Sequence, residues 1–79
     1  MKTFLFELIS SEKIIYSGLI SEVLIPTKLG LVGIRSGHAD MVCQTVAGKI
    51  VVNNNEKEFE VGEGFLEVTL AKTTVLILL

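Results

Sequence analysis

The sequence of 79 residues contains no tryptophan and only one cysteine, one proline and one histidine. The single cysteine, Cys43, excludes an internal disulfide and fits a reducing compartment. Basic residues are scattered singly and the formal net charge is −2, so nothing in the sequence indicates nucleic-acid binding. The longest apolar run, residues 75–79, is far shorter than the roughly 20 residues of a membrane-spanning helix. No signal peptide is recognisable, so we expect any membrane contact to be indirect, through a partner.

Apolar residues, by contrast, are abundant. They make up 49% of the chain, and the mean hydropathy is +0.61. A single domain over residues 1–79 has a small interior, and it cannot bury that much apolar material. We therefore expect apolar surface that a partner or a second copy of the chain covers.

The hydrophobic pattern predicts an all-β fold, because no stretch keeps the 3.6-residue period of a helix. We expect Pro26 to end one strand and the asparagines at 53–55 to form a hairpin turn. About nine short strands separated by regular turn signals are typical of a small β-sandwich or barrel. The expected strands span residues 3–9, 14–16, 19–25, 29–34, 41–47, 49–52, 57–61, 65–70 and 73–79.

The alternation of inward and outward side chains along a strand predicts part of the core. Phe4, Phe6 and Leu8 fall on one face of the first strand and are expected to point inward. Phe65 is expected in the interior as well. In the strand at 41–47, Cys43 is expected on the face opposite to Val42.

Few residues could act in catalysis or bind a metal or a phosphate group. His38, Asp40 and Cys43 supply at most three ligands where zinc needs three or four, and a pairing of His38 with Cys43 lacks an orienting group. The segment 30–33 lacks the lysine and serine or threonine of a phosphate loop. Glu56, Glu58, Glu60 and Glu63 form an acidic cluster, and alternation puts the first three on one solvent-exposed face of a strand. We predict no catalytic residue, no metal and no cofactor.

Five segments, in order along the chain, resemble the β-sandwich domain of the ε subunit of F-type ATP synthases. The family motifs are similar to "PEKxxYSG", "VxxVxxP", "GxxGIxPGHAP", "GGFLEV" and "VTVL". The matching segments are SEKIIYSG at 11–18, SEVLIP at 21–26, GLVGIRSGHAD at 30–40, GEGFLEV at 62–68 and TTVL at 73–76. Their order and approximate spacing agree over essentially the whole chain.

The sequence departs from the family pattern at a few positions. Ser36 and Asp40 replace two prolines, Leu31 replaces a common acidic residue, and Glu63 replaces a glycine. The pair of helices that usually follows the sandwich in this family is not part of the 79 residues. Since those helices carry inhibition in relatives, and ATP binding in some, the resemblance predicts neither property for this chain.

The resemblance implies a sandwich of about ten strands in the rotating central stalk, coupling ion-driven rotation to ATP synthesis without catalytic activity of its own. It implies contact with the γ subunit and the ring of c subunits at the cytoplasmic face of the bacterial inner membrane. The expected subunit-interface residues are Gly30, Leu31, Val32 and Gly33, toward the c ring, and His38 with Ala39, toward γ.

Other interpretations of the sequence stay open. One is a free-standing β-sandwich adaptor or homodimeric module unrelated to the synthase. Another is metal or thiol chemistry around His38 and Cys43. The segment 30–33 has two interpretations. It is a glycine-bounded turn whose apolar tip is covered by a partner, or it folds back as the start of a strand.

Overall fold

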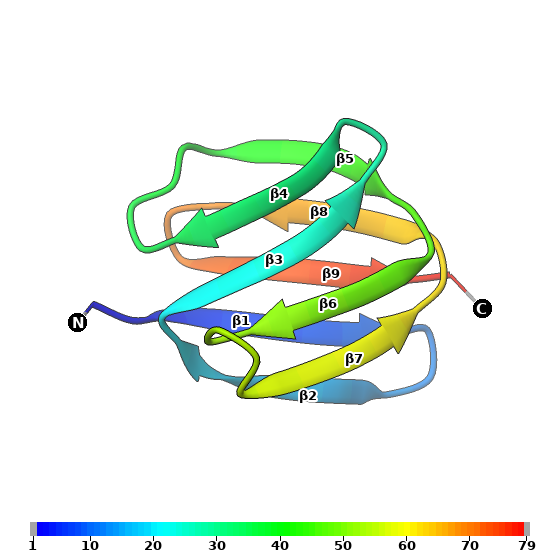
Figure 1. Cartoon of the computed structure of the whole chain (residues 1–79), viewed down its shortest axis with the longest axis horizontal. Helices are drawn as coiled ribbons and strands as arrows, with labels where there is room; N and C mark the ends of the chain where they lie inside the picture. The colour runs from blue at the N-terminus through cyan, green and yellow to red at the C-terminus, as the bar shows by residue number, and fades with distance from the viewer. Residues whose placement is uncertain (1, 79) are drawn as a thin grey trace.

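The computed structural model describes residues 2–78, and this part of the chain contains nine strands and no helix (Figure 1). The all-β prediction is confirmed. The strands are β1 (Phe4–Ser10), β2 (Ile14–Ile20), β3 (Glu22–Thr27), β4 (Gly30–Arg35), β5 (Met41–Thr45), β6 (Gly48–Val52), β7 (Lys57–Val61), β8 (Gly64–Val68) and β9 (Lys72–Ile77).

The strands form two packed layers, as the sandwich prediction requires. One layer has the order β2-β1-β9-β8-β5, and the other has β7-β6-β3-β4 (Figure 1). All neighbouring pairs are antiparallel except β1 and β9, which are parallel from Leu5–Lys72 to Ser10–Ile77. The first and last strands of the described chain are therefore partners inside one layer.

A single corner joins the two layers. There β3 of one layer pairs with β5 of the other at one position, Thr27 with Thr45. Two backbone hydrogen bonds flank this pair: the amide of Lys28 donates to the carbonyl of Gln44 (3.0 Å), and the amide of Val46 donates to the carbonyl of Pro26 (3.1 Å). Both threonines are buried.

Pro26 does not end β3, contrary to the sequence prediction. The strand continues to Thr27, and Pro26 pairs with Leu31 of β4. On its other side β3 changes partner here, from β6 opposite Leu24 to β5 opposite Thr27. A proline lacks the amide hydrogen that a continuous ladder needs, and it is tolerated because it stands where the ladder is interrupted.

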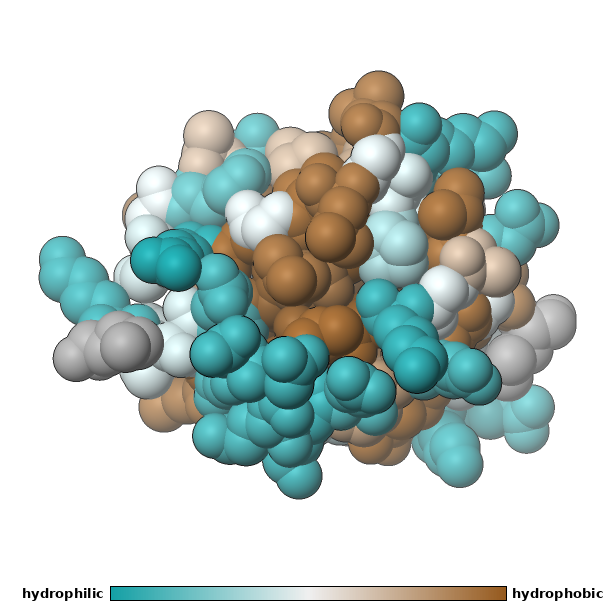
Figure 2. Space-filling view, in the orientation of Figure 1, coloured by the Kyte–Doolittle hydropathy of each residue, from teal (hydrophilic) through white to brown (hydrophobic). Residues whose placement is uncertain are grey.

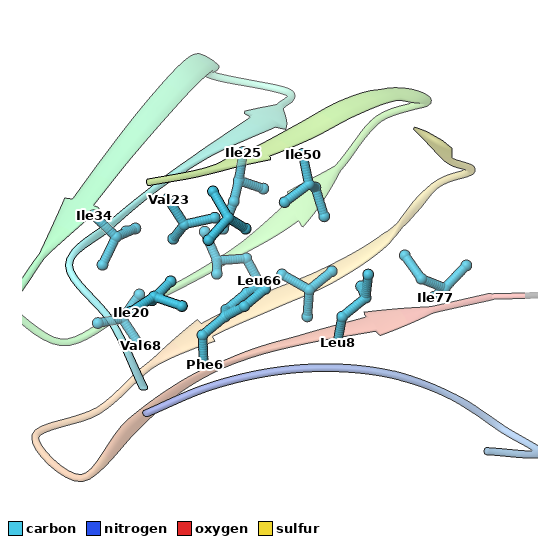
Figure 3. Packing of buried hydrophobic residues seen from close by; sticks show 12 residues of the cluster. Phe6, Leu8, Ile20, Val23, Ile25, Ile34, Ile50, Leu66, Val68 and Ile77 are labelled. Carbon is cyan, nitrogen blue, oxygen red and sulfur yellow. The ribbon is translucent and has the colours of Figure 1, made fainter. Parts of the chain in front are cut away.

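The core lies between the layers and consists mainly of apolar side chains, which point toward one another in Figure 3, with Thr45 and Thr73 also buried. Phe6 and Leu8 are fully buried as predicted, and Phe4 is half-buried against the same cluster. Cys43 also packs against the cluster while Val42 is exposed, as expected. The buried members are Phe6, Leu8, Ile20, Val23, Ile25, Ile34, Ile50, Val52, Leu66, Val68, Val75 and Ile77.

Phe65 is not in the core, so this prediction was wrong. In β8 the buried residues are Gly64, Leu66 and Val68, and Phe65 lies on the opposite side of the strand with 46% of its surface exposed. The physical reason is the two-residue period of a strand: Phe65 must share a face with Glu67, whose charge belongs in water.

The predicted break between residues 16 and 19 also differs from the structure. Ser17 and Gly18 do not close the second strand, because β2 continues along β1 to Ile20. The break falls instead at Ser21, between β2 and β3.

Asn53 fixes this break from a distant part of the sequence. It stands in the turn between β6 and β7 with φ = 50°, a conformation that asparagine tolerates. Its Oδ1 accepts hydrogen bonds from the amide of Ser21 (2.8 Å), the hydroxyl of Ser21 (2.9 Å) and the amide of Glu22 (3.2 Å). One side chain therefore ties the β6–β7 turn to the β2–β3 break.

At Gly64 the backbones of β8 and β9 approach each other closely. A Cβ atom at this position would stand 1.9 Å from the backbone oxygen of Leu76, far inside contact distance. Glu63, just before it, replaces a family glycine without such a conflict, because it is exposed and its φ is not positive. The glycine that remains in this pair is the one that the packing requires.

We expect Gly64→Ala to destabilise the domain by about 1–3 kcal/mol, because the added methyl group forces the β8 and β9 backbones apart. Gly62→Ala is the matched control, since a Cβ there meets nothing within 4 Å. Urea denaturation of both variants measures the difference. Equal stability of the two would show that β8 and β9 do not need the close approach.

Candidate interaction surfaces

Many large apolar side chains remain on the surface after the core is filled. They gather on the outer sides of both layers and at the turns. The exposed ones are Ile14, Ile15, Leu19, Leu29, Leu31, Val42, Phe65, Leu70, Leu76 and Leu78. The excess apolar material that the composition predicted is therefore on the surface.

The first apolar surface, the β3–β4 face, consists of Leu24, Pro26, Leu31 and Val51 on the outer side of β3, β4 and β6. The strand register places Leu31 beside Pro26 and Leu24 beside Val51. Leu31 is 67% exposed, and the other three are half-buried. Figure 2 shows this apolar area in the middle of the face, with hydrophilic residues below it.

The predicted interface residues Gly30, Leu31, Val32 and Gly33 all lie in β4, so the chain turns back into a strand here. The turn itself is formed by Lys28 and Leu29. At its base the Thr27 hydroxyl donates to the carbonyl of Gly30 (2.7 Å) and accepts from the amide of Leu29 (3.1 Å). Gly30 has φ = 111°, which favours glycine. Leu29, 79% exposed, is the apolar tip of this hairpin.

The other predicted interface residues, His38 and Ala39, lie in the loop from β4 to β5. The amide of His38 donates to the carbonyl of Arg35 (3.2 Å), and its ring Nδ1 donates to the carbonyl of Ala39 (2.7 Å). This loop follows the C-terminal end of β4, whereas Gly30 begins the strand. Gly30 and Leu31 therefore lie at the opposite end of β4 from His38, along a strand of about 20 Å, whereas Gly33 lines a hollow together with His38.

A hollow of about 390 Å³ lies beside His38, lined also by residues of β1, β2 and the β8–β9 turn. Arg35 and Lys72 border it, but both are engaged in ion pairs, with Glu22 (3.0 Å) and Glu7 (2.9 Å) respectively. The positive charge beside the hollow is thus largely neutralised by these carboxylates.

The second apolar surface, the β8–β9 face, consists of Ile9, Leu76 and Phe65 on the outer side of the other layer. These residues are aligned across three neighbouring strands: Ile9 pairs with Leu76, and Leu76 pairs with Phe65. Polar residues form the adjacent row, where Glu7 pairs with Thr74. This surface was not predicted from the sequence, although Phe65 and Glu67 are two residues apart in a strand and must therefore share an outward face.

An ion pair stands in the polar row beside the β8–β9 face. The ammonium group of Lys72 donates to Glu7 Oε1 (2.9 Å), and the hydroxyl of Ser17 donates to Glu7 Oε2 (3.3 Å). The hydrogen bond from Lys72 lowers the pKa of Glu7, and partial burial acts in the opposite direction. This pair links β1, β2 and β9 on the exposed side of the sheet.

The residues considered for chemistry are not assembled into a site. Within residues 2–78 no group of three His, Cys, Asp or Glu side chains is placed to hold a metal. Cys43 faces the core, whereas His38 lies in the β4–β5 loop. Glu58 and Glu60 alternate with half-buried Phe59 and Val61, as the sequence predicted. Over the same residues there is no helix that could span a membrane.

Comparison with known proteins gives one consistent result. Residues 3–78 match the family model of the ATP synthase delta/epsilon chain β-sandwich domain. The chain is 39% identical over 74 residues to the ATP synthase epsilon chain of Parvibaculum lavamentivorans, covering 90% of this chain and 56% of that one. It is 30% identical over 78 residues to the epsilon chain of Chlorobaculum tepidum, covering 95% and 89%.

Solved structures agree on the fold. A chain of the Euglena gracilis mitochondrial ATP synthase matches with a TM-score of 0.83 at 20% identity, covering 95% of this chain and 50% of that one. A chain from the central stalk and c ring of the Tetrahymena thermophila mitochondrial ATP synthase matches with a TM-score of 0.79 at 11% identity, covering 98% and 64%. The present chain thus spans about half the length of several relatives and most of the length of another.

We expect Phe65→Ala to cost only about 1 kcal/mol of stability or less, because the ring is already half in water. Phe6→Ala, a fully buried ring in the same fold, should cost about 3–5 kcal/mol. Chemical denaturation of the two variants compares the positions directly. Similar losses for both would mean that Phe65 contributes to the core.

The Glu7–Lys72 pair should make stability depend on pH in a defined direction. Because the folded state lowers the pKa of Glu7, the stabilisation is present above the unfolded pKa and is lost as the pH falls through the folded pKa. Glu7→Gln should therefore be less stable than the parent at neutral pH, and the difference should vanish in acid. Melting temperatures measured over a pH series test this. Glu63→Gln, an exposed carboxylate outside the ion pairs of residues 2–78, should not show the effect.

Proposed function

The chain belongs to the family of ATP synthase delta/epsilon chains, and on that premise we propose that it is a non-catalytic subunit of the central stalk. In this role it couples rotation of the ring of c subunits to ATP synthesis through contact with the γ subunit. We place it at the cytoplasmic face of the bacterial inner membrane, held there by its partners.

The observation that carries this proposal is the presence of two apolar surfaces on opposite layers of one small body. The β3–β4 face and the β8–β9 face lie outside different sheets, with the core between them. A subunit that transmits rotation must bind two partners at the same time and must not deform under the torque between them. Close-packed side chains between hydrogen-bonded sheets give that stiffness.

We assign the β3–β4 hairpin to the c ring. Its tip, Leu29, and the neighbouring Leu31 are among the most exposed apolar side chains of the described chain. Apolar tips of this kind are favourable when a partner removes them from water. The two hydrogen bonds of the Thr27 hydroxyl stiffen the base of the hairpin, so a load applied at the tip reaches the corner between the layers.

We assign the outer side of the β8–β9 layer, together with the His38–Ala39 loop, to γ. The aligned side chains of Ile9, Leu76 and Phe65 offer a flat apolar row across three strands. The loop leads directly into β5, the edge strand of the same layer. One partner can therefore cover the row and the loop from one side.

Leu31→Asp tests the proposal. The side chain points into solvent, so the variant should fold and melt close to the parent, with a change within about 0.5 kcal/mol. Its incorporation into the purified synthase, and ATP synthesis coupled to rotation, should fall, because a carboxylate in an apolar contact is costly to desolvate.

Asn54→Asp is the control, since it adds the same charge at an exposed position in the β6–β7 turn, outside both proposed faces. It should assemble at the parental level. Normal assembly and coupling by Leu31→Asp would contradict the assignment of the hairpin to an interface. Unfolding of Leu31→Asp would instead show that Leu31 supports the fold.

A further inference from the structure

The side of the sandwich opposite the Thr27–Thr45 corner is closed without a strand ladder. The two edge strands that face each other there are β2, at the end of one layer, and β7, at the end of the other (Figure 1). Within residues 2–78, β2 pairs only with β1 and β7 pairs only with β6. Along these two strands the layers are therefore held together by side chains.

Tyr16 of β2 bridges the two layers on this side. Its ring makes an edge-on contact with Phe59 of β7, with 5.4 Å between the ring centroids and 66° between the ring planes. The ammonium group of Lys57, also on β7, stands 5.8 Å from the centroid of the Tyr16 ring, within the range of a cation–π interaction. In its own layer the Tyr16 ring stands 6.1 Å from the buried ring of Phe6. Three rings thus lead from the core across to the other layer.

The position of the Tyr16 ring depends on Gly18. The two residues are two positions apart in β2 and share its inward face. A Cβ atom at Gly18 would stand 3.1 Å from the hydroxyl oxygen of Tyr16 and 3.5 Å from its Cζ, so the ring lies along the strand over the glycine. Gly18 pairs with Phe6 of β1. The missing side chain therefore leaves room for the Tyr16 ring beside Phe6.

β7 has little support other than the contact with Tyr16. Of the nine described strands it alone has no fully buried residue. Phe59 and Val61 are half-buried against the core, whereas Ile50 and Val52 of the neighbouring β6 are fully buried. Segments with few buried apolar contacts open at a lower free energy than the core does. β7 is thus the strand of its layer best able to open by itself.

The turn between β6 and β7 provides a place for a hinge. Asn53, Asn54 and Asn55 all have positive φ, at 50°, 54° and 73°, a backbone conformation that is unfavourable for most residues and that asparagine tolerates. Asn53 is held by its hydrogen bonds to Ser21 and Glu22, whereas Asn54 and Asn55 are exposed. A movement after Asn53 therefore displaces β7 and leaves β6 in place.

We propose that β7 is a movable edge of the sandwich and that Tyr16 is the clasp that holds it closed. When Tyr16 separates from Phe59 and Lys57, β7 leaves β6 as a unit while the other described strands stay folded. The opening uncovers one side of β6 and the part of the core on which Phe59 and Val61 pack. The two proposed stalk faces lie on other strands, so the proposal does not depend on the assignment of partners.

Hydrogen exchange of the folded 79-residue chain in low concentrations of urea tests the proposal. In the parent, amides of residues 57–61 should exchange faster than those of residues 72–77. Their exchange should also depend less on urea, because a local opening uncovers less surface than global unfolding. The same urea dependence for both segments would show that β7 opens only with the whole domain and would overturn the proposal.

Variants of Tyr16 identify the clasp. Tyr16→Leu should lower the protection of residues 57–61 by about tenfold, because it removes the ring–ring and cation–π contacts with β7. Tyr16→Phe keeps the ring and should retain most of the protection. Unchanged protection of residues 57–61 in Tyr16→Leu would show that Tyr16 does not hold β7.

Ile34→Val is the control that separates a clasp from a general loss of stability. Ile34 is buried in β4, at the other edge of the layer from β7. The variant should lower the protection of residues 72–77 about fivefold and leave that of residues 57–61 unchanged, because a local opening of β7 does not break the contacts of Ile34. An equal loss in both segments would overturn the proposal.

Phe59→Leu tests the same contact from β7, and it replaces Tyr16→Leu if that variant does not fold. It should also lower the protection of residues 57–61. In the double variant of Tyr16 and Phe59 the loss should be smaller than the product of the two single effects, because both substitutions remove one shared contact. Full independence of the two effects would show that the rings do not act together.

Discussion

The corner at Thr27 and Thr45 is the constraint on which the rest of this structure depends. One residue pair and two flanking backbone hydrogen bonds hold the two layers together at β3 and β5. Asn53 adds hydrogen bonds between the β6–β7 turn and the β2–β3 break, and apolar side chains fill the space between the layers. Hydrophobic packing is non-directional, so the hydrogen bonds at the corner and at Asn53 are what set how the layers lie across each other. Pro26 belongs to this corner because the ladder of β3 changes partner there.

This arrangement explains how so small a chain can present two separate apolar faces. A sandwich has an outer side on each layer, and the two-residue period sends every second side chain outward. Leu31 and Phe65 are outward-facing for the same geometric reason that Ile34 and Leu66 are buried. The faces cannot move independently, since both are built on strands that share one core. Stiffness and the ability to bind on two sides therefore have the same origin.

Much of the fold could be predicted from the sequence, because alternation and turn residues are local signals. Phe6 and Leu8 were placed correctly from one strand alone. The prediction for Phe65 was wrong because that residue shares the outer face of β8 with Glu67. The end of β2 could not be predicted, because it depends on Asn53, more than thirty residues away. The interface residues near Leu31 and His38 came from family resemblance, and local periodicity gives no information on what covers an exposed apolar residue.

The parallel pairing of β1 with β9 has a consequence for biosynthesis. Of the nine described strands a ribosome makes β1 first, yet β9, which flanks it opposite β2, is made last. Until then β1 can form only its hairpin with β2, and a two-stranded hairpin is marginally stable in water. The domain therefore folds through contacts between distant parts of the chain, which slows the search. Throughout that interval the nascent chain has an uncovered apolar strand that chaperones can hold.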